Sequence, residues 1–186
     1  MEILVTRHGQ TEWNVKRKVQ GKADIELNEQ GIEQAKEVQI KLKDEKIDLI
    51  ICSPLIRAKQ TAQIINENKN IPIIYDERIS ERDFGEFEGL EREKFDFSSF
   101  WSYRKNMQYE KAENIKELFN RVYAFLSDIK ERYKGKKVLI VTHGGISIPI
   151  ECYFKGIPNT EDLIGQGLGN CEVKKYEIRE IEIDER

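Results

Sequence analysis

The chain has 186 residues, 39% of them hydrophobic, which is enough for one sizeable core and predicts a single domain over 1–186. Its 31 basic residues nearly cancel its 34 acidic ones, and the net charge of -3 argues against a nucleic-acid partner. No apolar run approaches the roughly 18 residues of a membrane span, and Met1 leads into a strand-like run rather than a signal peptide, so we expect a cytoplasmic protein. Three scattered cysteines without a CxxC pair indicate neither a disulfide framework nor a thiolate metal cluster.

The first elements expected along the chain are a strand and a helix. Residues 1–6 form an apolar run of strand length, which is typical of a strand buried on both faces of a parallel sheet. Asn28 is a candidate N-cap for a helix over about 29–43, with Leu27 and Ile32 placed as a hydrophobic staple. Ile32 also begins a series of apolar residues at helical spacing that we expect on the buried face of this helix.

A second strand and helix and a third strand follow. Residues 49–52 form another apolar strand, which runs into Ser53 and Pro54, a favourable N-cap and first helical residue. A short third strand is expected over 71–75. The charged, glycine-punctuated residues 80–97 predict an irregular loop.

The rest of the chain repeats the alternation of strands and helices. Residues 115–133 carry the longest helical stripe of apolar residues, and 138–142 form a fourth apolar strand that a helix should follow. Residues 172–183 alternate with a period of about two and predict one or two closing strands at an edge, where antiparallel pairing is allowed. The whole pattern predicts an α/β fold, a three-layer doubly wound sandwich with a mainly parallel central sheet.

The only two histidines of the chain follow two of the predicted strands. His8 comes just after 1–6 and His143 just after 138–142, and each is followed by glycine, which lets a ligand approach the backbone. Because open α/β sheets bind ligands at the carboxyl ends of their strands, we expect His8 and His143 to share one site. Coincidence is the competing interpretation for any two histidines.

The residues around these histidines resemble the histidine phosphatase superfamily, also called the phosphoglycerate mutase-like family, in its phosphatase-type branch. The run RHGQTEWN at 7–14 matches the family signature RHGxTxxN. A three-residue RHG match is weak alone, but three further motifs follow in the family's order along nearly the whole chain. These are SPLIRA at 53–58, Glu81 with Gly85, Glu88 and Gly89, and VTHGG at 141–145.

The resemblance implies a role for each motif residue. His8 is the expected nucleophile, which forms a phosphohistidine while its second ring nitrogen keeps a proton on a backbone carbonyl. Arg7, Arg57 and His143 would stabilise the transferring phosphoryl group, and the first-turn position of Arg57 in its helix suits an anion. Glu81 would protonate the leaving oxygen and then deprotonate water. The remaining candidates, expected to bind phosphate or substrate, are Asn14, Gln20, Gly21 and Gly144.

Asn14 and Gln20 have an alternative role in turn or cap formation. No metal and no cofactor is expected, because two histidines at separate strand ends, without HxH or HExxH spacing, make a poor metal shell. The expected partner is a small-molecule phosphate monoester, with neither nucleic acid nor membrane. The sequence leaves open whether the chain is a monomer or a homodimer.

Hydrolysis is favoured over mutase-type phosphoryl transfer. Only a short cap insertion, around 90–112 and over the carboxyl edge of the sheet, separates Gly89 from the next helix, which leaves the pocket open to water. A noncatalytic phosphate-binding regulatory module is disfavoured, because a binder needs neither a nucleophile nor a proton donor. Both alternatives remain candidates beside the hydrolase.

Two features of the insertion stay open. Residues 95–109 are dense in aromatic side chains, which either bury one another in the cap or line the substrate pocket. Glu113 keeps the carboxylate of a family Gly-Glu-Ser motif without its flanking residues. It serves either the site or the dipole of the following helix.

Overall fold

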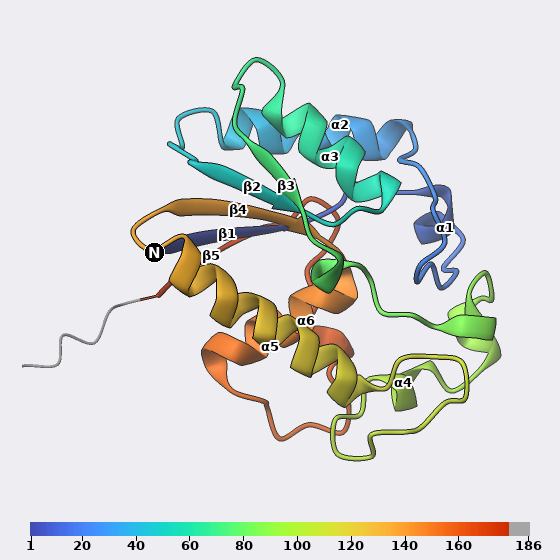
Figure 1. The fold of residues 1–186 in the computed structure, drawn as a ribbon. Coiled ribbons are helices and arrows are strands. Elements are labelled where there is room, and N and C mark those ends of the chain that lie inside the picture. The colour runs from blue at the N-terminus through green and yellow to red at the C-terminus, as the bar shows by residue number, and fades with distance from the viewer. Residues whose placement is uncertain (179–186) are drawn as a thin grey trace, which may run out of the picture.

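The computed structural model describes residues 1–178, in which a five-stranded sheet lies between two layers of helices (Figure 1). Neighbouring strands pair in parallel except β5, which runs antiparallel to β1 at one edge. The predicted α/β sandwich with a mainly parallel sheet is therefore confirmed. Along the chain the strands are β1 (Glu2–Arg7), β2 (Leu49–Cys52), β3 (Ile73–Tyr75), β4 (Lys137–Thr142) and β5 (Val173–Glu177). Their order across the sheet is β3-β2-β4-β1-β5.

Each face of the sheet is covered by a pair of longer helices (Figure 1). Successive side chains of a strand point to opposite faces, so Leu4 of β1 packs in one hydrophobic cluster while Ile3 and Val5 pack in the other. Burial on both faces explains the continuous apolar sequences of β2 and β4. One pair is α2 (Glu29–Lys41) with α3 (Ile56–Asn66), and the other is α5 (Ile115–Arg132) with α6 (Gly144–Lys155). None of the helices within 1–178 is long and apolar enough to cross a membrane.

Helix α2 begins at the predicted residue and ends at Lys41 rather than near residue 43. The Asn28 side chain caps it by accepting a hydrogen bond from the N–H of Gly31 at 2.9 Å. The prediction that Ile32 lies on the buried face is wrong, because Ile32 is 38% exposed. Gly31 takes the inward place, where a Cβ would lie 2.1 Å from the carbonyl oxygen of Gln10, so glycine lets the helix approach the loop after β1.

Helix α3 begins later than predicted. Leu55 is its N-cap and makes no side-chain capping bond, so Ser53 is not the cap and Pro54 lies outside the helix. The Ser53 hydroxyl is instead 2.7 Å from a ring nitrogen of His143. A residue expected to start a helix therefore contributes to the carboxyl edge of the sheet.

The third strand is shorter than the sequence predicts, and the closing strand is present. The third strand omits residues 71 and 72. The Asn66 side chain bonds both the N–H and the carbonyl of Ile71, at 2.9 and 2.8 Å, and so holds this residue outside the strand. The closing strand predicted over 172–183 is present as β5, and the part of that prediction over 179–183 lies outside the described residues.

Residues 90–112, called the cap segment below, lie at the end of the molecule where β1 and β4 end (Figure 1). Within it the ring of Phe100 stacks on Tyr109 with centroids 3.9 Å apart, and Phe95 lies 5.7 Å from Phe100. The aromatic residues therefore bury one another in the cap, which is one of the two roles expected for residues 95–109. Short helices in and around this segment are α1 (Glu12–Val15), α4 (Phe97–Phe100) and 3-10 turns at 77–79, 85–87, 92–94 and 164–166.

Candidate active site

The carboxyl ends of β1 and β4 bring the two histidines together. The strands pair with Arg7 opposite Thr142, and the N–H of His8 donates to the carbonyl of Thr142 at 2.9 Å. The rings of His8 and His143 lie 5.2 Å apart between centroids. Both are buried, with 2% of His8 and 0% of His143 exposed. The spacing allows one phosphoryl group to contact both rings.

His8 is held in the tautomer that a nucleophile needs. Its Nδ1 lies 2.7 Å from the carbonyl oxygen of Gly9, and because a carbonyl only accepts, Nδ1 carries the proton and Nε2 keeps its lone pair. Burial, together with the positive charges of Arg57 and Arg7, holds the pKa of His8 well below its ordinary value. His8 is therefore a neutral imidazole at neutral pH.

His143 lies at the same edge, beside Ser53. Its Nε2 is 2.7 Å from the Ser53 hydroxyl, and its Nδ1 is buried without a hydrogen-bond partner among residues 1–178. Burial is the main cause that lowers the pKa of His143, and the charge of Arg57 adds to it. A buried ring nitrogen without a protein partner is available to a ligand.

Two arginines flank the imidazoles. Arg57, in the first turn of α3, is fully buried and donates to the carbonyls of Ala23 and Gly21, each at 2.7 Å. Arg7 donates to the carbonyl of Leu168 at 3.1 Å. Burial lowers the pKa of both guanidinium groups to about 10, so both remain charged at neutral pH. The Nε of each is buried without a partner in the described chain, which leaves a pair of cationic donors for an anion.

Glu81 reaches this edge from the irregular segment after β3. Its carboxylate accepts hydrogen bonds from the N–H groups of Arg82 at 2.8 Å and Gly145 at 3.1 Å. Gly145 lies in the first turn of α6, whose dipole favours a negative group at that end. A Cβ on Gly145 would lie 2.3 Å from Glu81 Oε1 and 2.6 Å from Trp101 Cη2, so this approach requires glycine.

The four predicted binding residues have different surroundings. Asn14 accepts a hydrogen bond from the N–H of Thr11, and Gln20 accepts one from the Thr11 hydroxyl, each at 3.0 Å. The carbonyl of Gly21 accepts a hydrogen bond from Arg57, and Gly144 lies in the wall of a cavity. The alternative role is thus supported for Asn14, which forms a capping box of α1 with Thr11. A direct phosphate contact stays a prediction for all four residues.

A cavity of about 140 Å³ opens between this edge of the sheet and the cap segment. Arg7, Glu81 and Gly144 form one part of its wall. Much of the rest is apolar or aromatic and includes Phe97, Trp101, Ile148 and Leu168. Phe97 and Trp101 of the aromatic segment therefore line the cavity as well, and their contact with a substrate stays a prediction.

The cavity does not reach every predicted residue. His8, His143 and Arg57 are not part of its wall, although their neighbours Arg7 and Gly144 are. Among residues 1–178, no group of three or more His, Cys, Asp or Glu side chains could hold a metal ion.

Arg92 of the cap segment is a residue of the cavity wall that the sequence did not predict. Its guanidinium lies over the Phe97 ring at 5.1 Å, and its Nε is buried without a partner in the described part of the chain. Burial lowers the pKa of Arg92, against the opposing effect of the Glu81 charge. The charged run at 91–94 is typical of a solvated surface, so only the fold of the cap segment identifies this residue.

Comparisons with known proteins agree with this geometry. The chain matches the model of the histidine phosphatase superfamily (branch 1) over residues 3–184. It is 43% identical over 190 residues to the "uncharacterized phosphatase PhoE" of Bacillus subtilis (strain 168), and the match covers 98% of this chain and 94% of that protein. The structure is similar to that of Bacillus stearothermophilus YhfR, with a TM-score of 0.87 and 30% identity over 96% of this chain and 91% of that one. A mutant phosphoserine phosphatase of Entamoeba histolytica, in complex with phosphoserine, matches with a TM-score of 0.79 and 30% identity over 96% and 91% of the two chains.

The fold and the paired histidines at the carboxyl edge define an α/β enzyme of the phosphatase-like type. The chain belongs to the histidine phosphatase superfamily, branch 1, and the resemblance seen in its motifs is confirmed.

Proposed function

We propose that the protein hydrolyses phosphate monoesters through a phosphohistidine on His8, without a metal ion and with Glu81 as proton donor and acceptor. The observation that carries this proposal is the state of His8. Its Nδ1 proton is held by the carbonyl of Gly9 at 2.7 Å, and the positive charges of two arginines help to keep the ring neutral. Attack on phosphorus requires a nitrogen lone pair next to cationic donors.

In the first half-reaction, the phosphoryl oxygens bind the free donors of Arg7, Arg57 and His143. The Nε2 lone pair of His8 forms a bond to phosphorus while the bond from phosphorus to the substrate oxygen breaks. Protonated Glu81 gives its proton to that oxygen, and the alcohol leaves. The fixed cations stabilise the charge on the equatorial oxygens, which is commonly the largest catalytic contribution.

In the second half-reaction, water replaces the alcohol. Glu81, now a carboxylate, accepts a proton from water as the new phosphorus–oxygen bond forms and the phosphorus–nitrogen bond breaks. Inorganic phosphate leaves, and His8 returns to its neutral form. Glu81 can serve in both steps because it forms part of the cavity wall.

Substrate binding requires a side chain to move. His8 is 2% exposed and does not line the cavity, so a phosphoryl group cannot reach Nε2 past the present side-chain arrangement. Arg7 lines the cavity and is held by a hydrogen bond of 3.1 Å to the carbonyl of Leu168. We expect Arg7 to turn toward the phosphate.

The proposed substrate is a small organic phosphate that carries a second anionic group. The cavity of about 140 Å³ limits its size, and apolar side chains in its wall, such as Ile148 and Leu168, suit a carbon chain. The free Nε of Arg92 suits a carboxylate or a second acid. Phosphoserine, the ligand of the Entamoeba relative, is a compound of this kind. Hydrolysis rather than transfer is favoured because the short cap segment leaves the cavity open to water, which can attack the phosphohistidine once Arg7 has moved.

Turnover of an alkyl phosphate in the presence of a chelator tests the proposal. We expect His8→Ala to abolish turnover and Glu81→Gln to slow it about 100-fold or more, the size of effect that general acid–base catalysis provides. Glu86→Gln, an exposed carboxylate nearby, is the control and should retain the rate. Near-wild-type rates for His8→Ala and Glu81→Gln would refute both roles, and activity that chelation removes and a metal restores would refute the metal-independent mechanism.

A further inference from the structure

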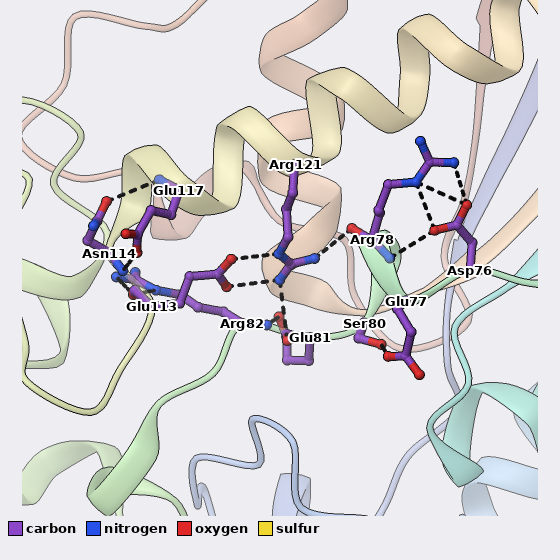
Figure 2. Close-up of polar contacts among 10 residues, drawn as sticks. All are labelled: Asp76, Glu77, Arg78, Ser80, Glu81, Arg82, Glu113, Asn114, Glu117 and Arg121. Atoms are coloured by element: carbon purple, nitrogen blue, oxygen red, sulfur yellow. Dashed lines mark hydrogen bonds and ion pairs between the residues drawn. The ribbon is translucent and has the colours of Figure 1, made fainter.

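The segment that carries Glu81 is held by side chains rather than by a sheet. Figure 2 shows Arg121 projecting from α5 toward this segment, with Glu113, at the end of the loop before α5, beside it. Arg121 Nη1 donates to the carbonyl of Arg78 at 2.6 Å, and Nη2 lies 3.4 Å from the carbonyl of Glu81. The N–H of Glu113 donates to the carbonyl of Asp83 at 3.0 Å. Backbone carbonyls on both sides of Glu81 are therefore fixed by two residues.

Arg121 and Glu113 form a two-bond ion pair. Arg121 Nε is 2.6 Å from Oε1 of Glu113, and Nη2 is 2.9 Å from Oε2. The side chains are 21% and 15% exposed, so solvent competes little for either charge. This pairing uses one edge of the guanidinium and leaves Nη1 for Arg78, an arrangement that a lysine ammonium cannot reproduce.

Arg82 holds Glu113 from the other side. The Arg82 side chain is fully buried, and its Nε and Nη2 donate to the carbonyl of Glu113 at 2.9 and 2.7 Å. Its Nη1 donates to the carbonyl of Phe100 in the cap segment. Glu113 is thus bound through its side chain to Arg121 of α5 and through its backbone to Arg82 and Asp83, the two residues that follow Glu81.

The dipole of α5 does not account for this arrangement. The cap of α5 is complete without Glu113, because Asn114 and Glu117 satisfy each other's N–H groups, each at 3.0 Å. The Glu113 carboxylate points to Arg121 in Figure 2, not to the free N–H groups of the helix. Neither Arg121 nor Glu113 lines the cavity, so neither contacts the substrate there.

We propose that Arg121 and Glu113 are positioning residues, which hold the backbone of Glu81 so that its carboxyl group meets the substrate oxygen. The inference rests on the proposed function. The Glu81 carboxylate itself has hydrogen bonds to two N–H groups, those of Arg82 and Gly145, so its direction depends on where the backbone of its segment lies. Loosening the ion pair should therefore impair proton donation and leave attack by His8 intact.

Two substrates separate these steps. An alkyl phosphate such as glycerol phosphate needs a proton donor as the alcohol leaves, whereas p-nitrophenyl phosphate releases a stable anion that needs none. We expect Arg121→Lys to lower kcat/KM for the alkyl phosphate about tenfold or more, within the range of general acid catalysis, and to change kcat/KM for the aryl phosphate little. Arg132→Lys, which alters an exposed ion pair of the same helix, is the control and should change neither.

A double-mutant cycle tests whether Arg121 acts through Glu81. Glu81→Gln and Arg121→Lys should each lower kcat/KM for the alkyl phosphate, and the double variant should be no slower than Glu81→Gln alone. The proposal would be overturned if the losses in kcat/KM of the two single variants multiplied in the double variant, or if each variant lost as much kcat/KM for the aryl phosphate as for the alkyl phosphate. Glu113→Gln should repeat the selective loss by removing the charge that holds Arg121, and it serves as the test if Arg121→Lys does not fold. If neither variant folds, the pair is a folding determinant and the proposal is wrong.

The two failures are distinguishable. Failure of the proposed function would appear in the wild-type protein as turnover without a phosphohistidine on His8. Failure of the positioning role would appear only in the variants, with His8 phosphorylated normally in the wild type.

Discussion

Gly145 determines how closely Glu81 approaches the first turn of α6. An alanine Cβ at this position would lie 2.3 Å from Glu81 Oε1, so the carboxylate would have to leave the N–H that it accepts from. We expect Gly145→Ala to lower kcat/KM for an alkyl phosphate about tenfold or more, since proton donation depends on that placement. Gly165→Ala is the matched control, because a Cβ there has no neighbour within 4 Å among the described residues. Indistinguishable kinetics for the two variants would contradict this role of Gly145.

Arg92 should select among substrates rather than drive the chemistry. Its side chain forms part of the wall of a cavity that Arg7 and Glu81 also line, and its Nε has no hydrogen-bond partner in the described chain. We expect Arg92→Gln to raise KM for phosphoserine about tenfold, as the loss of one charge-assisted hydrogen bond implies, while KM for a neutral alkyl phosphate changes little. Arg104→Gln, an exposed basic residue of the same segment, serves for comparison. A parallel rise in KM for both substrates would assign Arg92 to the phosphate instead.

At the residue level, the sequence is informative where a motif stands at the end of a strand. His8, His143 and their flanking arginines were predicted in this way, and they lie together. Arg92 was missed, because the residues that bring it to the cavity are those of an irregular segment. No periodicity or strand end indicates where such a segment folds.

At the level of elements, buried strands were predicted best. Three of them are apolar on both faces, which leaves no ambiguity about their orientation. Helix and strand ends were predicted less well, since contacts outside the local pattern decide them. The Ser53 hydroxyl meets His143, which lies far away in the sequence. The Asn66 side chain, at the end of the preceding helix, bonds both backbone polar groups of Ile71.

Helix α2 offers a test of local stability separate from activity. The Asn28 side chain accepts from the N–H of Gly31 at 2.9 Å, and substitution of such a cap typically costs about 1 kcal/mol. We expect Asn28→Ala to lower the free energy of unfolding in urea by that amount and to leave kcat/KM unchanged. Gln30→Ala, an exposed substitution in the first turn, should leave both quantities at wild-type values. Wild-type stability in Asn28→Ala would show that water caps the helix equally well.

For the whole molecule, the two buried histidines link stability to pH. Burial and nearby arginines hold the pKa values of His8 and His143 well below 6.5, so both rings stay neutral in the folded protein where the unfolded chain binds protons. The free energy of unfolding should therefore fall as pH decreases below 6.5, with a slope approaching about 1.4 kcal/mol per pH unit for each histidine.

Urea unfolding between pH 8 and pH 5.5 measures this slope above the range in which carboxylates titrate. His8→Ala should retain about half of the wild-type slope, because one of the two buried histidines remains. A flat profile in the wild-type protein would mean that both rings can be protonated in the folded state.

Passage of the phosphoryl group through His8 can be observed by rapid quenching of the enzyme with p-nitrophenyl phosphate, followed by mass spectrometry of the protein and its peptides. We expect one added phosphoryl group on His8 that is labile in acid and stable in base. It should accumulate further in Glu81→Gln, because the water step is slowed. Rapid turnover with no adduct at the earliest times, or an adduct on another residue, would contradict passage through His8.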